Sequence, residues 1–416
     1  MGGEKHLGKQ TTAGTRLASL EEELIIGNGK ALNEFWEEVQ SIGAPIIEIC
    51  NYDKNAVYIT FIYREKLPIQ NVVVFGSFPG YKYIENQLNR LTGTDLWFKT
   101  YEVRNDIRFS YSFSVNDSLD DNYVQRSKNK QIDRLNPNKI TFIKDEEDED
   151  SDLTEYSLVE LPNVPAQMWL SEYKYCNKGN MKLHRFSCDS SISERRIWVY
   201  APYNYEVIDQ KCNLVVLMDG FAYINTLNAV NVLDNLIFEG KISPTICIFI
   251  DNKEDRYNEL TCNAGFSEFI INELMPWILS NYNVYNDPTK TVIGGFSLSG
   301  LEAAFIGMNH SNIFGNVLCQ SGSLWWENEW LIEEFNARPK LPLKFHLSVG
   351  ILEDRPYDSK PIMMDNVIRF RDTLLNKGNI VYYEVFHSGH DYLSWGETLG
   401  NGLISLIGNK ESTLWI

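Results

Sequence analysis

The stretch VIGGFSLSGLEAAF, from Val292 to Phe305, combines the features of a strand, a tight turn and a helix. Its β-branched residues stop at Gly294 and Gly295, Ser297 follows, and small and apolar residues then resume at helical spacing. In the pattern G-x-S-x-G, a sharp turn lifts a serine hydroxyl clear of the strand end, and the turn needs small neighbours. Here Ser299 replaces the second glycine. The stretch raises the question whether Ser297 is a nucleophile or an ordinary turn serine.

The chain around this stretch alternates between apolar strands and helices from Gln167 onward. The expected strands are RRIWVYAP (195–202), NLVVLMDG (213–220), TICIFID (245–251) and KTVIGGFS (290–297), with the helical FSEFIINELMPWILSNY (266–282) before the last of them. Nearly continuous apolar strands indicate burial on both faces, and their alternation with helices predicts a mainly parallel α/β sheet. Ser297 then lies in the strand-to-helix turn that a nucleophile requires.

Partners for Ser297 follow in the order Ser, acid, His that is typical of α/β-hydrolases. They lie in HLSVGILEDRP (346–356) and VFHSGHDYLSW (385–395), each of which begins with an expected strand. We predict His390 as the general base, because it sits in a glycine-containing turn beyond the strand, and His387 is its rival. Glu353 is favoured as the acid on its distance from the strand end, and Asp354 remains the alternative.

An acyl-transfer site also needs two backbone N–H groups aimed at the developing oxyanion. One is expected from Leu298, directly after the nucleophile. The other is expected from the loop after VVLMDG, at Gly220 or Phe221.

The N-terminal part of the chain has a different pattern. An amphipathic helix is predicted over 32–42, and short β-rich runs separated by turn signals over 46–115 predict a small antiparallel sandwich. The acidic run KDEEDEDSD (144–152) is expected to be a solvated linker or loop, because like charges at this density repel one another. We therefore predict a sandwich domain with a leading helix and this linker over 1–165, and an α/β-hydrolase domain over 166–416.

Composition narrows the classes of partner. A formal net charge of −18 argues against nucleic acid or an anionic membrane as the main partner. No stretch approaches the roughly 20 apolar residues of a membrane span, and the N-terminus lacks a signal-peptide core, so a cytoplasmic protein is expected. The seven cysteines show no zinc spacing. Neither a metal nor a cofactor is expected, and the expected partner is a small-molecule ester.

Several motifs together resemble the enterochelin (ferric enterobactin) esterases. In the α/β part these are LVVLMDGFAY, DRYNELTCNAGF, VIGGFSLSGLEAAF, VLCQSGSLWW, VGILEDRP and HSGHDYLSW, and in the N-terminal part FGSFPG, LTGTDLWFKTYEV, RFSYSFSVND and DRLNP. The resemblance runs from about residue 56 onward. It implies an immunoglobulin-like sandwich joined to an esterase domain, and a cytoplasmic serine esterase that opens ferric triscatecholate trilactone siderophores. By position it makes Ser297 the nucleophile, His390 the base and Glu353 the acid.

The resemblance also implies substrate-binding residues. Arg256 falls where the family has an arginine near the substrate, and Trp325 and Trp326 fall at an aromatic pair. A guanidinium and flat apolar walls suit an anionic aromatic ligand. The alternative for Arg256 is an ion pair with Glu254, Asp255 or Glu259, and the alternative for the tryptophans is core packing.

Three functions stay open at this point. The first is the siderophore esterase, whose anionic ligand would need a local basic cluster, with Arg256, Lys253 and Arg355 as candidates. The second is an esterase acting on another ester, such as a feruloyl or acetyl sugar. The third is a non-catalytic binding protein that kept the fold. Ser299 in place of glycine could reshape the turn or mark an altered substrate.

Overall fold

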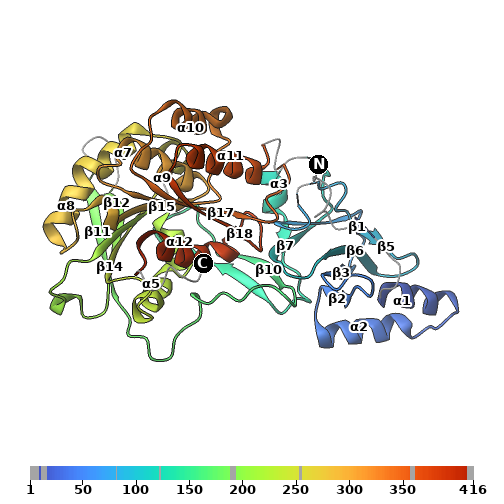
Figure 1. Ribbon diagram of the computed structural model, residues 1–416. Coiled ribbons are helices and arrows are strands. Elements are labelled where there is room, and N and C mark those ends of the chain that lie inside the picture. The colour runs from blue at the N-terminus through green and yellow to red at the C-terminus, as the bar shows by residue number, and fades with distance from the viewer. Residues whose placement is uncertain are drawn as a thin grey trace.

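The computed structural model describes residues 9–10, 16–80, 82–120, 123–187, 194–252, 255–356 and 361–409. Its strands form one eight-stranded sheet and two five-stranded sheets. Figure 1 shows the large sheet with its helices at one end of the molecule and the two small sheets at the other. The predicted pairing of an α/β-hydrolase domain with a sandwich domain is confirmed.

The large sheet has the strand order β11-β12-β14-β13-β15-β16-β17-β18. Pairing is antiparallel for β11 with β12 and for β12 with β14, and parallel across the rest of the sheet. The strands are β11 (Asn180–Ser187), β12 (Glu194–Ala201), β13 (Asn213–Leu217), β14 (Thr245–Ile250), β15 (Thr291–Phe296), β16 (Asn316–Gln320), β17 (Lys344–Gly350) and β18 (Ile380–Phe386).

Both faces of this sheet are covered by helices, as the apolar strands predict. In β13, Leu214 and Val216 join the core on one face, while Val215 and Leu217 join the core on the other, because successive side chains of a strand alternate. The helices are α4 (Gly220–Asn225), α5 (Ala229–Phe238), α6 (Arg256–Glu259), α7 (Ala264–Phe269), α8 (Met275–Asn281), α9 (Leu298–Asn309), α10 (Trp326–Ala337), α11 (Met363–Asn376) and α12 (Tyr392–Ile407). A π-helical turn, Ile270–Leu274, joins α7 to α8.

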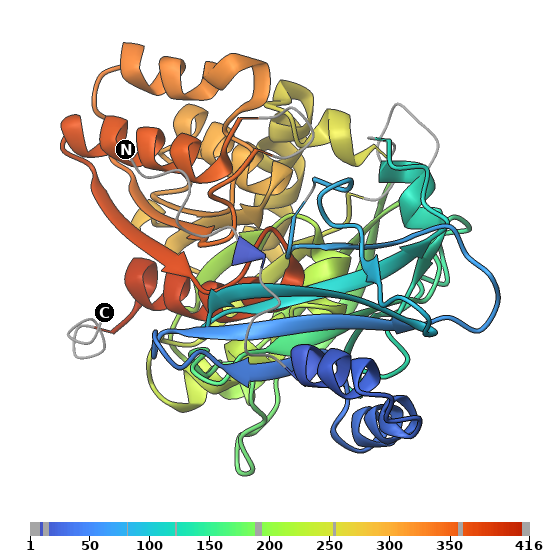
Figure 2. The same ribbon diagram turned by 90° about the vertical axis from the view of Figure 1, so that its right-hand side faces the viewer.

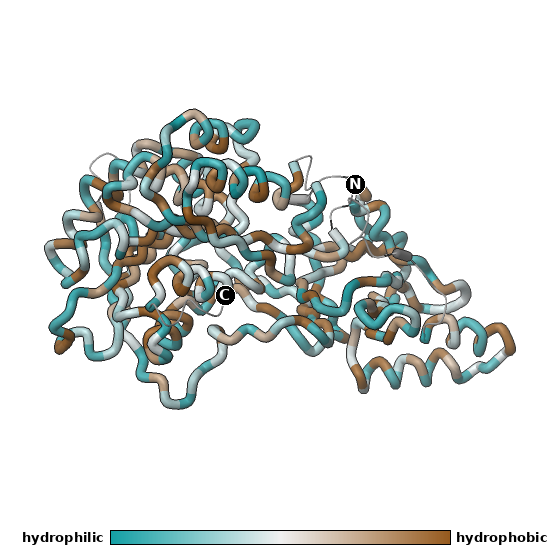
Figure 3. Tube along the Cα trace, viewed as in Figure 1, coloured by the Kyte–Doolittle hydropathy of each residue, from teal (hydrophilic) through white to brown (hydrophobic). Residues whose placement is uncertain are grey.

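The N-terminal domain is a sandwich of two antiparallel sheets, ordered β1-β6-β3-β2 with β5 beside β6, and β4-β7-β10-β9 with β8 beside β7. Its strands are β1 (Lys9–Gln10), β2 (Ile46–Ile49), β3 (Ala56–Arg64), β4 (Val72–Gly76), β5 (Asn89–Arg90), β6 (Leu96–Arg104), β7 (Arg108–Val115), β8 (Lys130–Gln131), β9 (Lys139–Phe142) and β10 (Thr154–Glu160). Aromatic side chains such as Phe61, Phe109 and Tyr111 fill the space between the sheets. Figure 3 shows hydrophobic stretches of the chain in both parts of the molecule.

Three helices accompany the sandwich. The predicted helix over 32–42 is present as α2 (Ala31–Ile42), and it is preceded by α1 (Arg16–Ile25). Phe35 and Trp36 of α2 pack with Ile62 and Phe98 of the sheet formed by β3 and β6. Figure 2, viewed from the sandwich side, shows both helices beside the strands. The third helix, α3 (Tyr123–Lys128), follows β7. None of the described helices combines the length and apolar character that a membrane crossing requires.

The acidic run between β9 and β10 is a mostly exposed loop, but one of its carboxylates is buried, which the sequence did not predict. Asp145 is buried, with its carboxylate paired with the guanidinium of Arg196 on β12. The same guanidinium binds Asp251 at 2.6 Å, and Glu147 pairs with Arg185 on β11. The Asp145 carboxylate can be buried here because Arg196 of the other domain neutralises it, whereas the pair of Glu147 with Arg185 is exposed. The proposed domain boundary at 165/166 falls between β10 and β11 and stays a prediction.

The contact between Arg196, Asp145 and Asp251, which joins the two domains, provides a test of the fold. We call this contact the junction. Replacing Arg196, whose side chain is 4% exposed, by alanine removes the cation that Asp145 and Asp251 both face. We expect the free energy of unfolding to fall by about 3–5 kcal/mol, measured by urea denaturation. The matched control is Arg185→Ala, whose pair with Glu147 is exposed and should cost less than about 1 kcal/mol. Equal small effects would contradict a structural role for the junction.

Candidate active site

Ser297 lies in the turn between β15, which ends at Phe296, and α9, which begins at Leu298. Its backbone has φ 55° and ψ −120°, a conformation that L-residues rarely adopt and that is found at strained functional turns. Gly295 is needed at this point, because a Cβ there would lie 2.5 Å from the backbone of Ser299. The turn thus has the strained strand-to-helix geometry of a nucleophile elbow.

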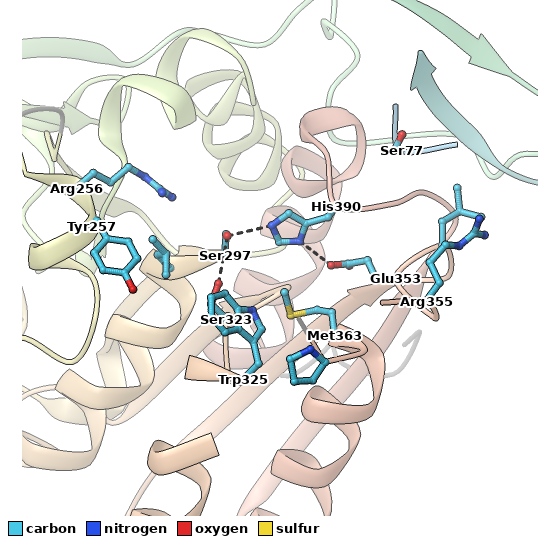
Figure 4. A pocket seen from close by; sticks show the side chains of 13 residues that line it. Ser77, Arg256, Tyr257, Ser297, Ser323, Trp325, Glu353, Arg355, Met363 and His390 are labelled. Atoms are coloured by element: carbon cyan, nitrogen blue, oxygen red, sulfur yellow. Dashed lines mark hydrogen bonds and ion pairs between the residues drawn. The ribbon is translucent and has the colours of Figure 1, made fainter. Parts of the chain in front are cut away.

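The structure brings Ser297, His390 and Glu353 together from three separate turns. The Oγ of Ser297 lies 3.0 Å from Nε2 of His390, and Nδ1 of His390 lies 2.7 Å from Oε1 of Glu353. Glu353 follows β17 and His390 follows β18, so all three side chains meet at the carboxyl edge of the parallel strands (Figure 4). In this arrangement the imidazole can accept the serine proton while the carboxylate stabilises the resulting imidazolium.

The second oxygen of Glu353 is held by groups to which the sequence pattern gave no role. Its Oε2 accepts hydrogen bonds from the Ser321 hydroxyl at 2.7 Å and from the Gly350 N–H at 2.5 Å. The Ser321 oxygen in turn accepts one from Nε1 of Trp395 at 3.1 Å, and the Trp395 ring packs edge-on against His390. These contacts fix the orientation of the buried Glu353 carboxylate. Ser321 and Trp395 lie in the motifs QSGS and HDYLSW, but neither spacing nor residue type marked their role.

The rival candidates lie elsewhere. Asp354 forms an ion pair with Arg355, at 3.4 Å, and not with an imidazole. His387 turns toward the sandwich domain, where its Nδ1 lies 2.8 Å from the backbone oxygen of Asp106. Each rival therefore has a partner outside the Ser297–His390 pair.

A cavity of about 390 Å³ opens beside the three residues. Figure 4 shows Arg256 and Tyr257 on one side of Ser297, and His390 and Glu353 on the other. The lining residues are Ser77, Arg256, Tyr257, Ser297, Leu298, Ser323, Trp325, Leu352, Glu353, Arg355, Pro361, Met363 and His390. The cavity therefore combines the reactive groups with arginine and aromatic side chains.

The adjacent tryptophans have different positions. Among the described residues that line the cavity, Trp325 is present and Trp326 is not. Trp326 packs against the core of the α/β domain, with its ring centroid 6.0 Å from that of Trp330. For Trp326 the core-packing alternative therefore describes its position.

Of the residues expected to donate hydrogen bonds to the oxyanion, one lines the cavity. Leu298 lines it directly after the nucleophile. Gly220 and Phe221 open α4, and the Phe221 ring lies against Trp198, with centroids 6.4 Å apart. Neither is among the described residues that line the cavity, so a second donor at Gly220 or Phe221 stays a prediction.

Arg256 lines the cavity and also forms an ion pair, but with a partner that the sequence did not suggest. Its Nε and Nη2 lie 2.6 and 2.8 Å from the two carboxylate oxygens of Asp219. Of the partners expected, Glu259 pairs instead with Arg195, and Glu254 lies outside the described residues, as does Lys253. Burial lowers the pKa of Arg256, but the charge of Asp219 outweighs this and raises it. The guanidinium is therefore fixed as a cation at the cavity wall.

The sandwich domain contributes directly to this site. Ser77 lines the cavity, and Arg355 donates a hydrogen bond to the backbone oxygen of Pro79 at 2.8 Å. Gly80 has φ +106°, and a Cβ there would lie 3.1 Å from the Arg355 guanidinium, so the close approach favours glycine. Leu352, next to Glu353, is buried in the core of the sandwich. Glu353 is therefore carried on a loop that both domains contact.

No group of three or more His, Cys, Asp or Glu side chains that could hold a metal ion occurs within the residues that the structure describes.

Relatives of known function share both domains. An iron(III) enterobactin esterase of Dickeya dadantii is 26% identical over 406 residues, which is 88% of this chain and 91% of that protein. An iron(III) salmochelin esterase of Escherichia coli O6:H1 is 24% identical over 93% of this chain and 96% of its own length. The solved structure of a ferric enterobactin esterase from Salmonella typhimurium has a TM-score of 0.72 at 23% identity, covering 90% of this chain and 98% of that one. It therefore shares the fold.

Two family models match the chain. One, described as the N-terminal part of enterochelin esterases, matches residues 58–170. The other, described as a putative esterase, matches residues 190–406, which is more than half of the chain. The chain therefore belongs to the esterase family, with the N-terminal domain of the enterochelin esterases joined to it.

Proposed function

We propose that this protein is a serine esterase that hydrolyses the ester bonds of ferric triscatecholate trilactone siderophores and so releases their iron. The observation that carries the proposal is one cavity lined by Ser297, His390 and Glu353 together with Arg256 and Trp325. The first three supply ester hydrolysis, and the other two suit an anionic, aromatic ligand. We further propose that the reaction takes place in the cytoplasm, where the resemblance to this family sets it.

In the proposed reaction the Ser297 hydroxyl attacks a lactone carbonyl while His390 accepts its proton at Nε2. The oxyanion that forms is stabilised by the N–H of Leu298 and by one from Gly220 or Phe221. His390 then returns the proton to the leaving alcohol, and water hydrolyses the acyl-enzyme by the reverse sequence. Glu353 keeps the imidazole in the required tautomer and stabilises its cation throughout.

Arg256 and Trp325 are the proposed recognition groups. A ferric triscatecholate is negatively charged and presents flat rings, so a guanidinium can attract it and an indole face can pack against it. Because the protein has a formal net charge of −18, attraction must come from such a local cation. Arg355 also lines the cavity and is a second candidate.

The relatives favour this substrate over a sugar ester. The enterobactin and salmochelin esterases align with 88% and 93% of this chain, so that their likeness includes the sandwich domain. An endo-1,4-beta-xylanase/feruloyl esterase of Xylanibacter ruminicola aligns with 40% of it. The catalytic geometry in turn speaks against a non-catalytic binding protein.

The substrate is tested by chromatography of the products from three ester classes. We expect the purified protein to release dihydroxybenzoyl-serine fragments from a ferric catecholate trilactone, and to act far more slowly on feruloyl and acetyl sugars. Ser297→Ala is the control for contaminating esterases. Faster hydrolysis of a sugar ester than of the trilactone would overturn the proposed substrate, and no hydrolysis of any ester would overturn the esterase.

The acid is tested by comparing Glu353→Gln with Asp354→Asn. The amide in Glu353→Gln cannot stabilise the imidazolium, so we expect kcat to fall by about 10²–10⁴-fold. Asp354→Asn is the matched control, because Asp354 pairs with Arg355, and it should change kcat by less than about threefold. The reverse order of effects, measured with a chromogenic aryl ester, would move the acid to Asp354.

Arg256→Ala tests the recognition of charge. The loss of a charge-assisted contact should weaken the binding of the ferric trilactone by about 1–3 kcal/mol, seen as a raised KM. Hydrolysis of a small neutral aryl ester should change little by comparison. Added salt should weaken ferric-ligand binding more in the wild type than in the variant, because screening acts on the contact that the variant lacks. Equal losses with both esters would make Arg256 a structural residue.

A further inference from the structure

The serine that replaces glycine in the nucleophile turn is part of a hydrogen-bond network. Ser299 is completely buried near the start of α9, and its Oγ accepts a hydrogen bond from the Phe296 N–H at 2.9 Å. Its single proton has two acceptors within reach, the backbone oxygen of Phe296 at 2.7 Å and Oδ2 of Asp219 at 2.8 Å. A carboxylate is the stronger acceptor because it is charged. The hydroxyl therefore connects the nucleophile turn to Asp219.

Asp219 is the junction between this turn and the cavity wall. Its backbone is in the left-handed region, with φ 58°, two residues beyond the end of β13, and its N–H donates to Oδ1 of Asn252 at 3.0 Å. Its carboxylate receives Nε of Arg256 on Oδ1 and Nη2 on Oδ2. Oδ2 is the oxygen that the Ser299 hydroxyl also reaches. One carboxylate thus joins the nucleophile turn to the cation of the cavity.

This connection matters because Arg256 is only partly covered. Its side chain is 37% exposed, whereas that of Asp219 is 7% exposed. A long arginine side chain at the edge of a cavity can adopt several rotamers. If a rigid partner already holds it in one rotamer, less conformational entropy is lost when the ligand binds. Asp219 can act as that rigid partner only if its own carboxylate is fixed. Ser299 supplies a donor to Asp219 from inside the core.

We propose that Ser299 is a positioning residue that sets the preference of this esterase for anionic substrates. Its hydroxyl fixes the Asp219 carboxylate, which holds the guanidinium of Arg256 toward the cavity. The inference rests on the proposed role of Arg256 in reading substrate charge. A glycine at position 299, as in the usual form of the turn, keeps the turn and loses this link.

The test compares Ser299→Gly and Ser299→Ala in the wild-type and Arg256→Ala backgrounds. The substrates are two 4-nitrophenyl esters of equal length, one neutral and one ending in a carboxylate. We expect the ratio of kcat/KM for the anionic ester to that for the neutral ester to fall about tenfold in both variants, mainly through KM. In the Arg256→Ala background the same substitutions should cause no further fall, because residues that act through one another are not additive.

Ser405→Ala is the matched control. Ser405 is a buried serine of α12 whose Oγ lies 2.9 Å from Nδ1 of His346 and donates to the backbone oxygen of Gly402. The Ser405→Ala substitution removes a comparable buried hydroxyl from a different helix. It should leave the ratio of kcat/KM for the anionic and neutral esters unchanged. Thermal unfolding midpoints of all variants show whether each is folded. If Ser299→Ala does not fold, the test relies on Ser299→Gly, which introduces the residue that the turn commonly has.

The inference is overturned if the Ser299 variants leave the ratio of kcat/KM for the anionic ester to that for the neutral ester unchanged. It is also overturned if the Ser299 substitutions lower that ratio as much in the Arg256→Ala background as in the wild type. An unchanged ratio in Arg256→Ala alone would also overturn it, because Arg256 would then not read charge. The aryl esters do not depend on the siderophore. If the protein does not hydrolyse the ferric trilactone but the aryl-ester ratio changes as expected in the variants, the proposed substrate is refuted. The role of Ser299 is then unaffected.

Discussion

The backbone of Ser297 is held in a conformation that a serine avoids when it is free, and the rest of the site is arranged around that constraint. The N–H of Ser297 donates to the backbone oxygen of Gln320 at the end of β16. Its own backbone oxygen accepts hydrogen bonds from the N–H groups of Ser323, at 2.9 Å, and Leu301, at 3.2 Å. Hydrogen bonds to the neighbouring strand, the loop after it and the helix therefore keep Ser297 in its unfavourable backbone conformation. In this conformation the hydroxyl projects toward His390. A relaxed turn would move the hydroxyl away from the imidazole.

The sandwich domain contacts the loops that carry Glu353 and His390. Leu352 anchors the loop of Glu353 in the sandwich core, and the N–H of Arg108 donates to the backbone oxygen of His387 in the loop of His390. The buried ion pairs of Arg196 with Asp145 and Asp251 hold the two domains at a second place. The positions of Glu353 and His390 thus depend on contacts across the domain interface as well as on the α/β sheet.

The sequence predicts the fold, and the order of the serine, acid and histidine along the chain, better than it predicts which charged residues form ion pairs. Apolar strands alternating with helices define the sheet, because burial of both faces leaves a direct pattern in the residues. The partner of Arg256 could not be read in this way, because Asp219 is 37 residues away and nearer carboxylates compete for the same cation. Trp325 and Trp326 are adjacent and chemically identical, so only the direction of the chain at the start of α10 decides which one faces the cavity. Asp145 was expected in solvent because the arginine that neutralises it belongs to another domain.

The central claim is that Ser297 is a nucleophile activated by His390. Mass spectrometry of the protein after reaction with a fluorophosphonate measures this directly, because the probe forms a stable adduct with an activated serine. The account predicts one adduct, on the peptide that contains Ser297, and its near absence in His390→Ala. Ser323 is the informative alternative, since its hydroxyl lies 3.4 Å from that of Ser297 in the same cavity. An adduct on Ser323, or labelling of Ser297 at the same rate without His390, would contradict the account.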